Sequence, residues 1–217
     1  ALTTPGALGG EGADKKAAVA LAMNHFGVSE ADLKKVLAAA LEKGGDYADL
    51  FFEHTISNSI RLMDGAVNNS YSNIDYGVGV RVLTGDQSGY AYVENITVED
   101  MLKAARTAAR IASANKGNKP LNLTEKELKK NYYTVASPWE EVSLKDKMPY
   151  LQKLNDRIFA LDKRVHKVQA SQSDTTSHIF FCKSEGVMFY DYRPMVTLGA
   201  ECYMEEAGKT EHGYAPR

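Results

Sequence analysis

The chain has 217 residues, of which 44% are hydrophobic, and its formal net charge at pH 7 is −2. This composition is typical of a soluble globular protein with a real core, and the length allows one large domain or two ordinary ones. A nucleic-acid-binding protein needs a basic face, and a membrane-spanning helix needs about eighteen or more consecutive apolar residues. The net charge is slightly negative and no apolar run of that length occurs, so we expect no nucleic-acid partner and no membrane partner.

Two helices are predicted at the start of the chain. Asp14–Phe26 is rich in alanine, has apolar residues at helical spacing, and is followed by Gly27 as a natural stop. The second helix is predicted over Ser29–Lys43. Ser29 is suited to be its N-cap, Asp32 completes a capping pattern three residues later, and the apolar residues that follow form one stripe.

Strands and tight turns are predicted next. The predicted strands are Ala48–Ser57, Ser59–Leu62 and the polar segment Val67–Ser72, with a turn at Met63–Ala66. Residues 73–92 then read NIDYGVGVRVLTGDQSGYAY, in which every second residue of the central run is valine. This alternation predicts a β-hairpin with one apolar face and a turn over residues 84–89.

Five residues of this hairpin are candidates for a functional role. Gly77 and Gly79 weaken a strand, so each is predicted to mark a bulge or the close approach of another backbone. Asp75 and Arg81 are polar positions in an apolar hairpin, and we expect them to pair with each other or to lie on an exposed strand face. Asn73 suits a turn, a bulge or a contact with a bound molecule.

A third helix is predicted between Thr97, its N-cap, and Gly117, with Asp100 completing the capping pattern. One face of this helix is basic. Its cations suit either phosphates or an acidic partner, or else a solvated face with Glu99 paired to the first of them. The basic residues are Lys103, Arg106 and Arg110.

The polar, irregular stretch at residues 118–137 predicts a linker or mobile insertion. It separates an amino-terminal α+β domain, residues 1–117, from a middle α+β domain, residues 138–217. The middle domain opens with a helix from Ser143 to Asp162, in which Pro149 predicts a kink or a late start. Its predicted strands are Val165–Asp174, Ser177–Lys183, Val187–Tyr192 and Met195–Glu206. The predicted fold class is α+β, with helices packed on mostly antiparallel sheets in two subdomains.

Motifs for catalysis within this chain are absent from the sequence. The five histidines are scattered, and none is paired with another at the helical spacing of a zinc site. Neither a dinucleotide fingerprint nor a phosphate-binding loop nor a nucleophile motif occurs. Cys182 and Cys202 lie on predicted neighbouring strands, where they either form a bridge or remain two buried thiols.

Several segments together resemble the TldD branch of the TldD/PmbA metallopeptidase family, also called modulators of DNA gyrase. The hairpin pattern N-I-D-x-G-V-G-V-R, followed by G-Y-A-Y, is the most specific of them, and the likeness covers roughly residues 29–214. The other segments are Gly45–Glu53, Ala104–Arg110, Asp162–Val165, Asp191–Pro194 and Glu205–Lys209.

The resemblance implies a zinc peptidase whose catalytic motif, H-E-x-x-x-H, does not occur in this chain. In that family a carboxy-terminal domain carries the motif and the zinc. We therefore expect this chain to be the amino-terminal and middle portion of a TldD-like protein, with no metal ligand or catalytic residue of its own and no activity alone. Asn73, Asp75, Gly77, Gly79 and Arg81 then become candidate peptide-guiding residues or a structural signature of the hairpin.

By the same resemblance, the parent protein is expected in the cytoplasm, with unfolded or extended peptides as substrates. It is expected to form a homodimer or a heterodimer with a TldE-like subunit, and this portion would form walls of the peptide cleft and part of the subunit interface. Tyr190, Asp191 and Tyr192 either meet the peptide or serve in packing. Two alternatives stay open: a non-catalytic module that captures peptides or partners by β-augmentation, and an inert subunit of a peptidase heterodimer.

Overall fold

The structure is a computed structural model that describes residues 14–112, 123–126 and 138–216. The chain divides into two compact units. The first unit combines Ala1–His54, Asp75–Thr134 and Ser177–Tyr192, and the second combines Thr55–Ile74, Val135–Thr176 and Arg193–Arg217. Each unit is therefore assembled from segments that are distant in the sequence.

The described helices lie where the sequence predicts them. They are α1 (Asp14–Phe26), α2 (Glu30–Leu41), α3 (Val98–Ile111) and α4 (Leu144–Phe159), with a short 3-10 turn, η2 (Trp139–Glu141). The predicted N-caps Ser29, Thr97 and Ser143 are confirmed. Each side chain accepts a hydrogen bond from the backbone N–H of the residue three positions later. Of the two effects expected from Pro149, a kink or a late start, the late start does not occur, because α4 begins at Leu144 directly after its cap Ser143.

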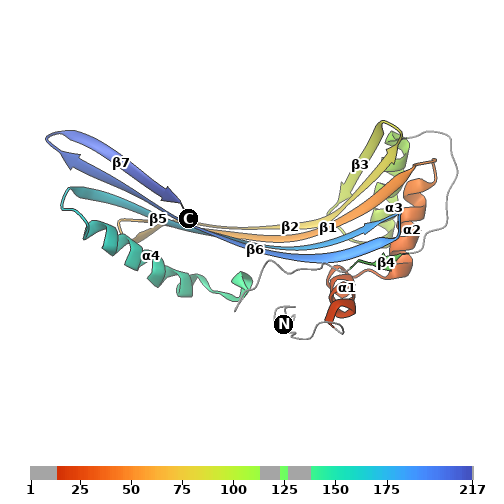
Figure 1. Cartoon of the computed structure of the whole chain (residues 1–217), viewed down its shortest axis with the longest axis horizontal. Coiled ribbons are helices and arrows are strands. Elements are labelled where there is room, and N and C mark those ends of the chain that lie inside the picture. The colour runs from red at the N-terminus through yellow and green to blue at the C-terminus, as the bar shows by residue number, and fades with distance from the viewer. Residues whose placement is uncertain (1–13, 113–122, 127–137, 217) are drawn as a thin grey trace. The chain divides into compact units, whose positions relative to one another are not determined.

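The described strands form one sheet in the order β3-β2-β1-β5-β6-β4, with β7 paired to β6 (Figure 1). β2 pairs antiparallel with β3, and β6 with β7, whereas the two-residue β4 runs parallel to β6. Together with the helices, this arrangement confirms the α+β class. The strands are β1 (Tyr47–Met63), β2 (Ala66–Thr84), β3 (Gln87–Val93), β4 (Thr124–Glu125), β5 (Val165–Lys183), β6 (Val187–Glu206) and β7 (Lys209–Pro216).

Several predicted strand breaks are wrong, because β1, β5 and β6 each continue through them. The sequence suggests a break at polar residues, but here polar residues pair with each other between strands. Ser59 and Ser173 are joined by a hydrogen bond of 3.0 Å between their hydroxyl oxygens, and Ser57 and Thr175 by one of 3.4 Å. A strand can pass through such polar positions as long as its side chains find partners across the ladder.

The hairpin of β2 and β3 is confirmed, but its turn is shorter than predicted. Strand pairing continues to Thr84 and Gln87, which leaves Gly85 and Asp86 as a two-residue turn. Gly85 has a φ of +54°, and its N–H donates to an Asp46 carboxylate oxygen at 2.9 Å. Glycine suits this turn because it adopts a positive φ without steric cost.

The first unit contains the larger apolar core. The valines of β2 pack with residues of β1 and with the buried stripes of α2 and α3, and Figure 1 shows α2 and α3 side by side near β3. The largest fully buried side chains of this core include Phe26, Leu33, Leu37, Leu50, Phe52, Met101 and Phe180. The second unit has a smaller apolar cluster, in which α4 covers β1 and β5 through Leu151, Ile60, Leu62 and Ala170.

The predicted linker, residues 118–137, falls largely outside the described residues. Its described part, residues 123–126, contains β4, whose Thr124 and Glu125 pair with Val187 and Met188. Among the described helices, none is both long enough and apolar enough to cross a membrane.

Gly89 of β3 packs directly against the backbone at the carboxy-terminal end of α3. A Cβ at this position would collide with the Ala108 carbonyl oxygen and would lie 2.9 Å from the Ala112 nitrogen. We predict that Gly89→Ala lowers the free energy of unfolding by about 2 kcal/mol, because backbone atoms must move to accept the methyl group. Gly213→Ala is the matched control, since nothing lies within 4 Å of its Cβ. Urea denaturation measures both, and equal stabilities would contradict the prediction.

Candidate functional site

Arg81 forms the central ion pair of the first unit. Its Nε and Nη2 atoms donate to Asp49 Oδ2 at 2.9 and 2.6 Å, and the guanidinium lies 5.9 Å from the centre of the Tyr47 ring. Asp49 is buried, whereas about half of the Arg81 side chain is exposed. The hydrogen bonds from Arg81 to Asp49 raise the pKa of the guanidinium. Burial, assisted by the negative charge of Asp49, raises the pKa of the Tyr47 phenol to about 12.

The expected pair between Arg81 and Asp75 is therefore wrong. Both residues belong to the single strand β2, six positions apart, which corresponds to roughly 20 Å at the rise of an extended chain. Asp75 is exposed and Asn73 is half-buried, and each makes other interactions. These residues follow one another along a strand and do not converge on one point.

The two candidate glycines differ in what surrounds them. A Cβ on Gly77 would lie 2.5 Å from the Val93 carbonyl oxygen, and one on Gly79 would lie 2.5 Å from the Tyr90 hydroxyl and 2.9 Å from its ring. The close backbone approach predicted for Gly77 is thus confirmed, whereas the neighbour of Gly79 is the outer end of an exposed side chain, which can move aside. Backbone packing therefore accounts for Gly77 in the signature pattern.

A cluster of three histidines in the first unit was not predicted from the sequence. The ring centroid of His25 in α1 lies 4.9 Å from those of His54 in β1 and His178 in β5, which are 6.0 Å from each other. His25 Nε2 and His54 Nδ1 are hydrogen-bonded at 2.7 Å, and His178 Nδ1 is bonded to the Tyr190 hydroxyl at 2.7 Å. Each strand histidine is two residues from a core phenylalanine, Phe52 or Phe180; this pattern could have indicated their shared face.

The histidine cluster does not have the geometry of a zinc site. Zinc requires ring nitrogens that point at a common centre about 2 Å away, but His25 and His54 direct nitrogens at each other. Over the described ranges, no group of three or more His, Cys, Asp and Glu side chains could hold a metal ion. We therefore assign no metal chemistry to these residues.

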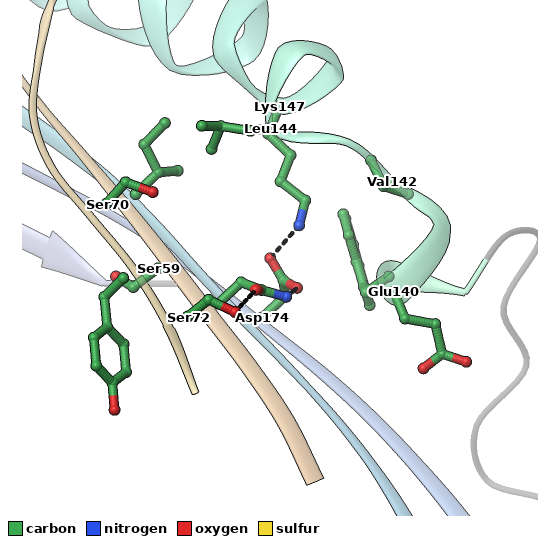
Figure 2. A pocket seen from close by; sticks show the side chains of 12 residues that line it. Ser59, Ser70, Ser72, Glu140, Val142, Leu144, Lys147 and Asp174 are labelled. Atoms are coloured by element: carbon green, nitrogen blue, oxygen red, sulfur yellow. Dashed lines mark hydrogen bonds and ion pairs between the residues drawn. The ribbon is translucent and has the colours of Figure 1, made fainter. Parts of the chain in front are cut away.

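The second unit contains a cavity of about 280 Å³ between α4, η2 and the neighbouring strands. Figure 2 shows Lys147 reaching from α4 toward Asp174 of β5, with Ser72 of β2 beside Asp174 and with Ser59 and Ser70 further to the left. The lining combines hydroxyl and amide groups with an indole and aliphatic side chains. It consists of Asn58, Ser59, Ile60, Ser70, Tyr71, Ser72, Trp139, Glu140, Val142, Leu144, Lys147 and Asp174.

A buried ion pair forms the polar end of this cavity. Lys147 Nζ lies 2.7 Å from Asp174 Oδ2, and the two side chains are only 6% and 3% exposed. Asn58 Nδ2 donates to the other Asp174 oxygen at 3.2 Å, and Ser72 Oγ donates to Asn58 Oδ1 at 2.9 Å. Burying two charges costs several kcal/mol per ion, so the pair persists only with this supporting network. Lys147 also lies 5.9 Å from the centre of the Trp139 ring.

The sequence contains a signal for this ion pair that lies outside any catalytic motif. Lys147 lies four residues before the buried Leu151, on the inward side of α4, and Asp174 alternates with the buried Gln172 and Thr176 of β5. A charged residue at a core position must find a partner. Two such residues of opposite charge in one predicted domain therefore indicate a buried pair.

Comparison with known proteins places the chain in a family. Residues 48–112 match the family model for PmbA/TldA metallopeptidase domain 1. Residues 137–216 match the model for the PmbA/TldA metallopeptidase central domain. The chain belongs to the PmbA/TldD metallopeptidase family, as the hairpin pattern indicated.

Curated relatives include two metalloprotease TldD homologues. The chain is 31% identical to that of Haemophilus influenzae over 172 residues, which cover 77% of this chain and 35% of the relative. It is 30% identical to that of Buchnera aphidicola from Schizaphis graminum over 168 residues, again 77% of this chain and 35% of the relative. The chain thus spans about a third of the length of these relatives.

Solved structures support the fold. A protein from Thermotoga maritima described as a modulator of DNA gyrase gives a TM-score of 0.65 at 18% identity, covering 86% of this chain and 42% of its own. TldE from Thermococcus kodakarensis gives a TM-score of 0.58 at 15% identity, covering 86% of this chain and 43% of its own. At these identities the likeness concerns the fold alone.

The pair of Arg81 and Asp49 is expected to stabilise the first unit. We predict that Arg81→Met lowers the free energy of unfolding by about 2 kcal/mol, because it leaves the buried carboxylate without its partner. Replacing both residues, Arg81→Met with Asp49→Leu, should cost less than the single change, since no unpaired charge remains. Lys103→Met is the control, because Lys103 is an exposed partner of Glu99 on α3 and its loss should change little. A single variant as stable as the parent would refute the prediction.

The two cysteines are free and differ in burial. Burial, assisted by the nearby charges of Asp49 and Glu30, raises the pKa of the Cys182 thiol to about 12. Because the thiolate is the reactive form, Cys182 should resist alkylation at pH 8 and react only as the pH approaches that value or the chain unfolds. Cys202 is half-buried and should react first. Mass spectrometry after iodoacetamide treatment locates the label, and labelling of Cys182 in the native protein at pH 8 would disprove this assignment.

Proposed function

We propose that this chain is the amino-terminal and central portion of a TldD-like zinc metallopeptidase that hydrolyses unfolded or extended peptides. The carrying observation is the match to two successive domains of one metallopeptidase family. In this proposal, the zinc and its ligands belong to a further domain of the parent protein. A zinc ion held there would supply the activated water for hydrolysis of the peptide bond.

This chain would provide walls of the peptide cleft and part of the interface between subunits. Sheet edges suit the first role, because an extended peptide can add to an edge through backbone hydrogen bonds. Among the described strands, β3 pairs with β2 and β7 pairs with β6, and all eight residues of β7 are exposed. The fold shared with TldE supports a TldE-like subunit as the partner, alongside a homodimer. The family resemblance further supports a cytoplasmic location.

A non-catalytic peptide-binding module is the second candidate, and the exposed β7 favours it. In that case, β7 alone would capture extended peptides and no hydrolysis would follow. An inert subunit of a peptidase heterodimer would likewise show no hydrolysis by itself. Both candidates predict that the product of the complete coding sequence, by itself, hydrolyses no peptide, whereas the main proposal predicts hydrolysis.

The test compares this chain with the product of the complete coding sequence. We predict that the complete product, alone or with a TldE-like subunit, binds zinc and cleaves a fluorescently labelled unfolded polypeptide. This chain should do neither. A variant of the complete product with the motif histidines replaced is the control and should lose both properties. A complete product without zinc or cleavage, together with peptide binding by this chain, would overturn the proposal in favour of the binding module.

A further inference from the structure

The cavity of the second unit presents more hydrogen-bond donors than its own residues use. An ammonium group has three N–H donors, and within the described part of the chain Asp174 is the acceptor of Lys147. Asn58 uses one amide hydrogen on Asp174, and Ser59 accepts from Ser173, which leaves its own hydroxyl hydrogen available. The polar end of the cavity therefore suits a group that only accepts hydrogen bonds.

The acidic residues of the cavity do not oppose such a group strongly. Both Asp174 oxygens already accept a hydrogen bond, one from Lys147 and one from Asn58. In Figure 2, the Glu140 carboxylate points away from the ion pair, and Glu140 has other interactions. A ligand carboxylate that accepts from the Lys147 ammonium would form a charge-assisted hydrogen bond, which is among the strongest in proteins when the surroundings are dry.

The remaining wall of the cavity is apolar. The side chains of Ile60, Val142 and Leu144 line it together with the Trp139 ring. Its volume of about 280 Å³ lies just below the usual range for drug-sized ligands, so it suits a small ligand. A ligand with one carboxylate and one aliphatic side chain matches both the size and the two kinds of lining.

We propose that this cavity binds a carboxylate that neighbours an apolar side chain, the group present in an N-acylated aliphatic amino acid and at the carboxy terminus of a peptide. Lys147 donates to the carboxylate with support from Asn58 and Ser59, and the apolar wall receives the side chain. The site needs no zinc and no other domain, so its test is independent of the proposed function.

The first experiment titrates this chain with N-acetyl-L-leucine and with N-acetyl-L-leucinamide, followed by NMR chemical shifts. The amide has almost the same shape but exchanges the carboxylate for a group that also donates hydrogen bonds. We expect the acid to bind about tenfold or more tightly than the amide, with shifts confined to residues around the cavity. Equal binding of the two, or binding of neither at millimolar ligand, would overturn the proposal.

A second pair of ligands identifies the source of the carboxylate. These are a pentapeptide that ends in leucine with a free carboxy terminus and the same peptide with an amidated terminus. Binding of the free peptide indicates a peptide end as the ligand, whereas binding of the N-acetyl amino acid alone indicates a small acid. Each result supports the shared chemistry, and a peptide that binds equally well in both forms contradicts it.

Two variants connect the binding to the cavity. Lys147→Met alone would leave a buried carboxylate unpaired, so it is combined with Asp174→Leu to keep the fold; this double variant should bind acid and amide equally weakly. Ser70→Phe leaves the ion pair intact and fills the cavity, so it should abolish binding. Ser88→Phe makes the same change at an exposed position of β3 and should bind as the parent does. Thermal denaturation checks that each variant folds, and unchanged binding by a folded Ser70→Phe variant would refute the site.

Discussion

The alternation of side chains along the paired strands is the constraint on which both units depend. A slip of one residue would move every side chain of a strand to the other face. In β2, the alternation places Val80 and Val82 in the core and Arg81 on the opposite face against Asp49. In β5, it places Asp174 where it meets Lys147. Strand register therefore determines both the apolar core and the two ion pairs.

The two units are stabilised by different kinds of buried side chains. The first unit buries a large apolar cluster against α2 and α3, and such burial contributes about 25 cal/mol for each Å² of apolar surface. The second unit has a smaller apolar cluster and buries polar groups, among them Gln172, Thr176 and the pair of Lys147 and Asp174. Buried polar groups cost stability unless they are paired. The cavity lined by Lys147 and Asp174 is consequently the part of the described molecule best suited to recognise a polar ligand.

The signature by which this chain resembles the PmbA/TldD metallopeptidase family has a structural role in the described residues. The matched models are domain 1 and the central domain, and the described residues contain no group suited to a metal ion. The signature glycine Gly77 allows the close approach of the Val93 backbone within the hairpin. The hairpin pattern therefore identifies the family through its fold rather than through reacting groups, which is the usual division between scaffold and site.

The sequence by itself determined the helices, their caps at Ser29, Thr97 and Ser143, the β2–β3 hairpin and the α+β class. These features depend on interactions between residues a few positions apart, which local patterns record. Only the tertiary structure decided where the long strands end and that Arg81 pairs with Asp49. It alone also brought the three histidines together and placed Lys147 against Asp174. These partners come from different elements. The pairing of distant strands brings them into contact, and local sequence patterns do not specify that pairing.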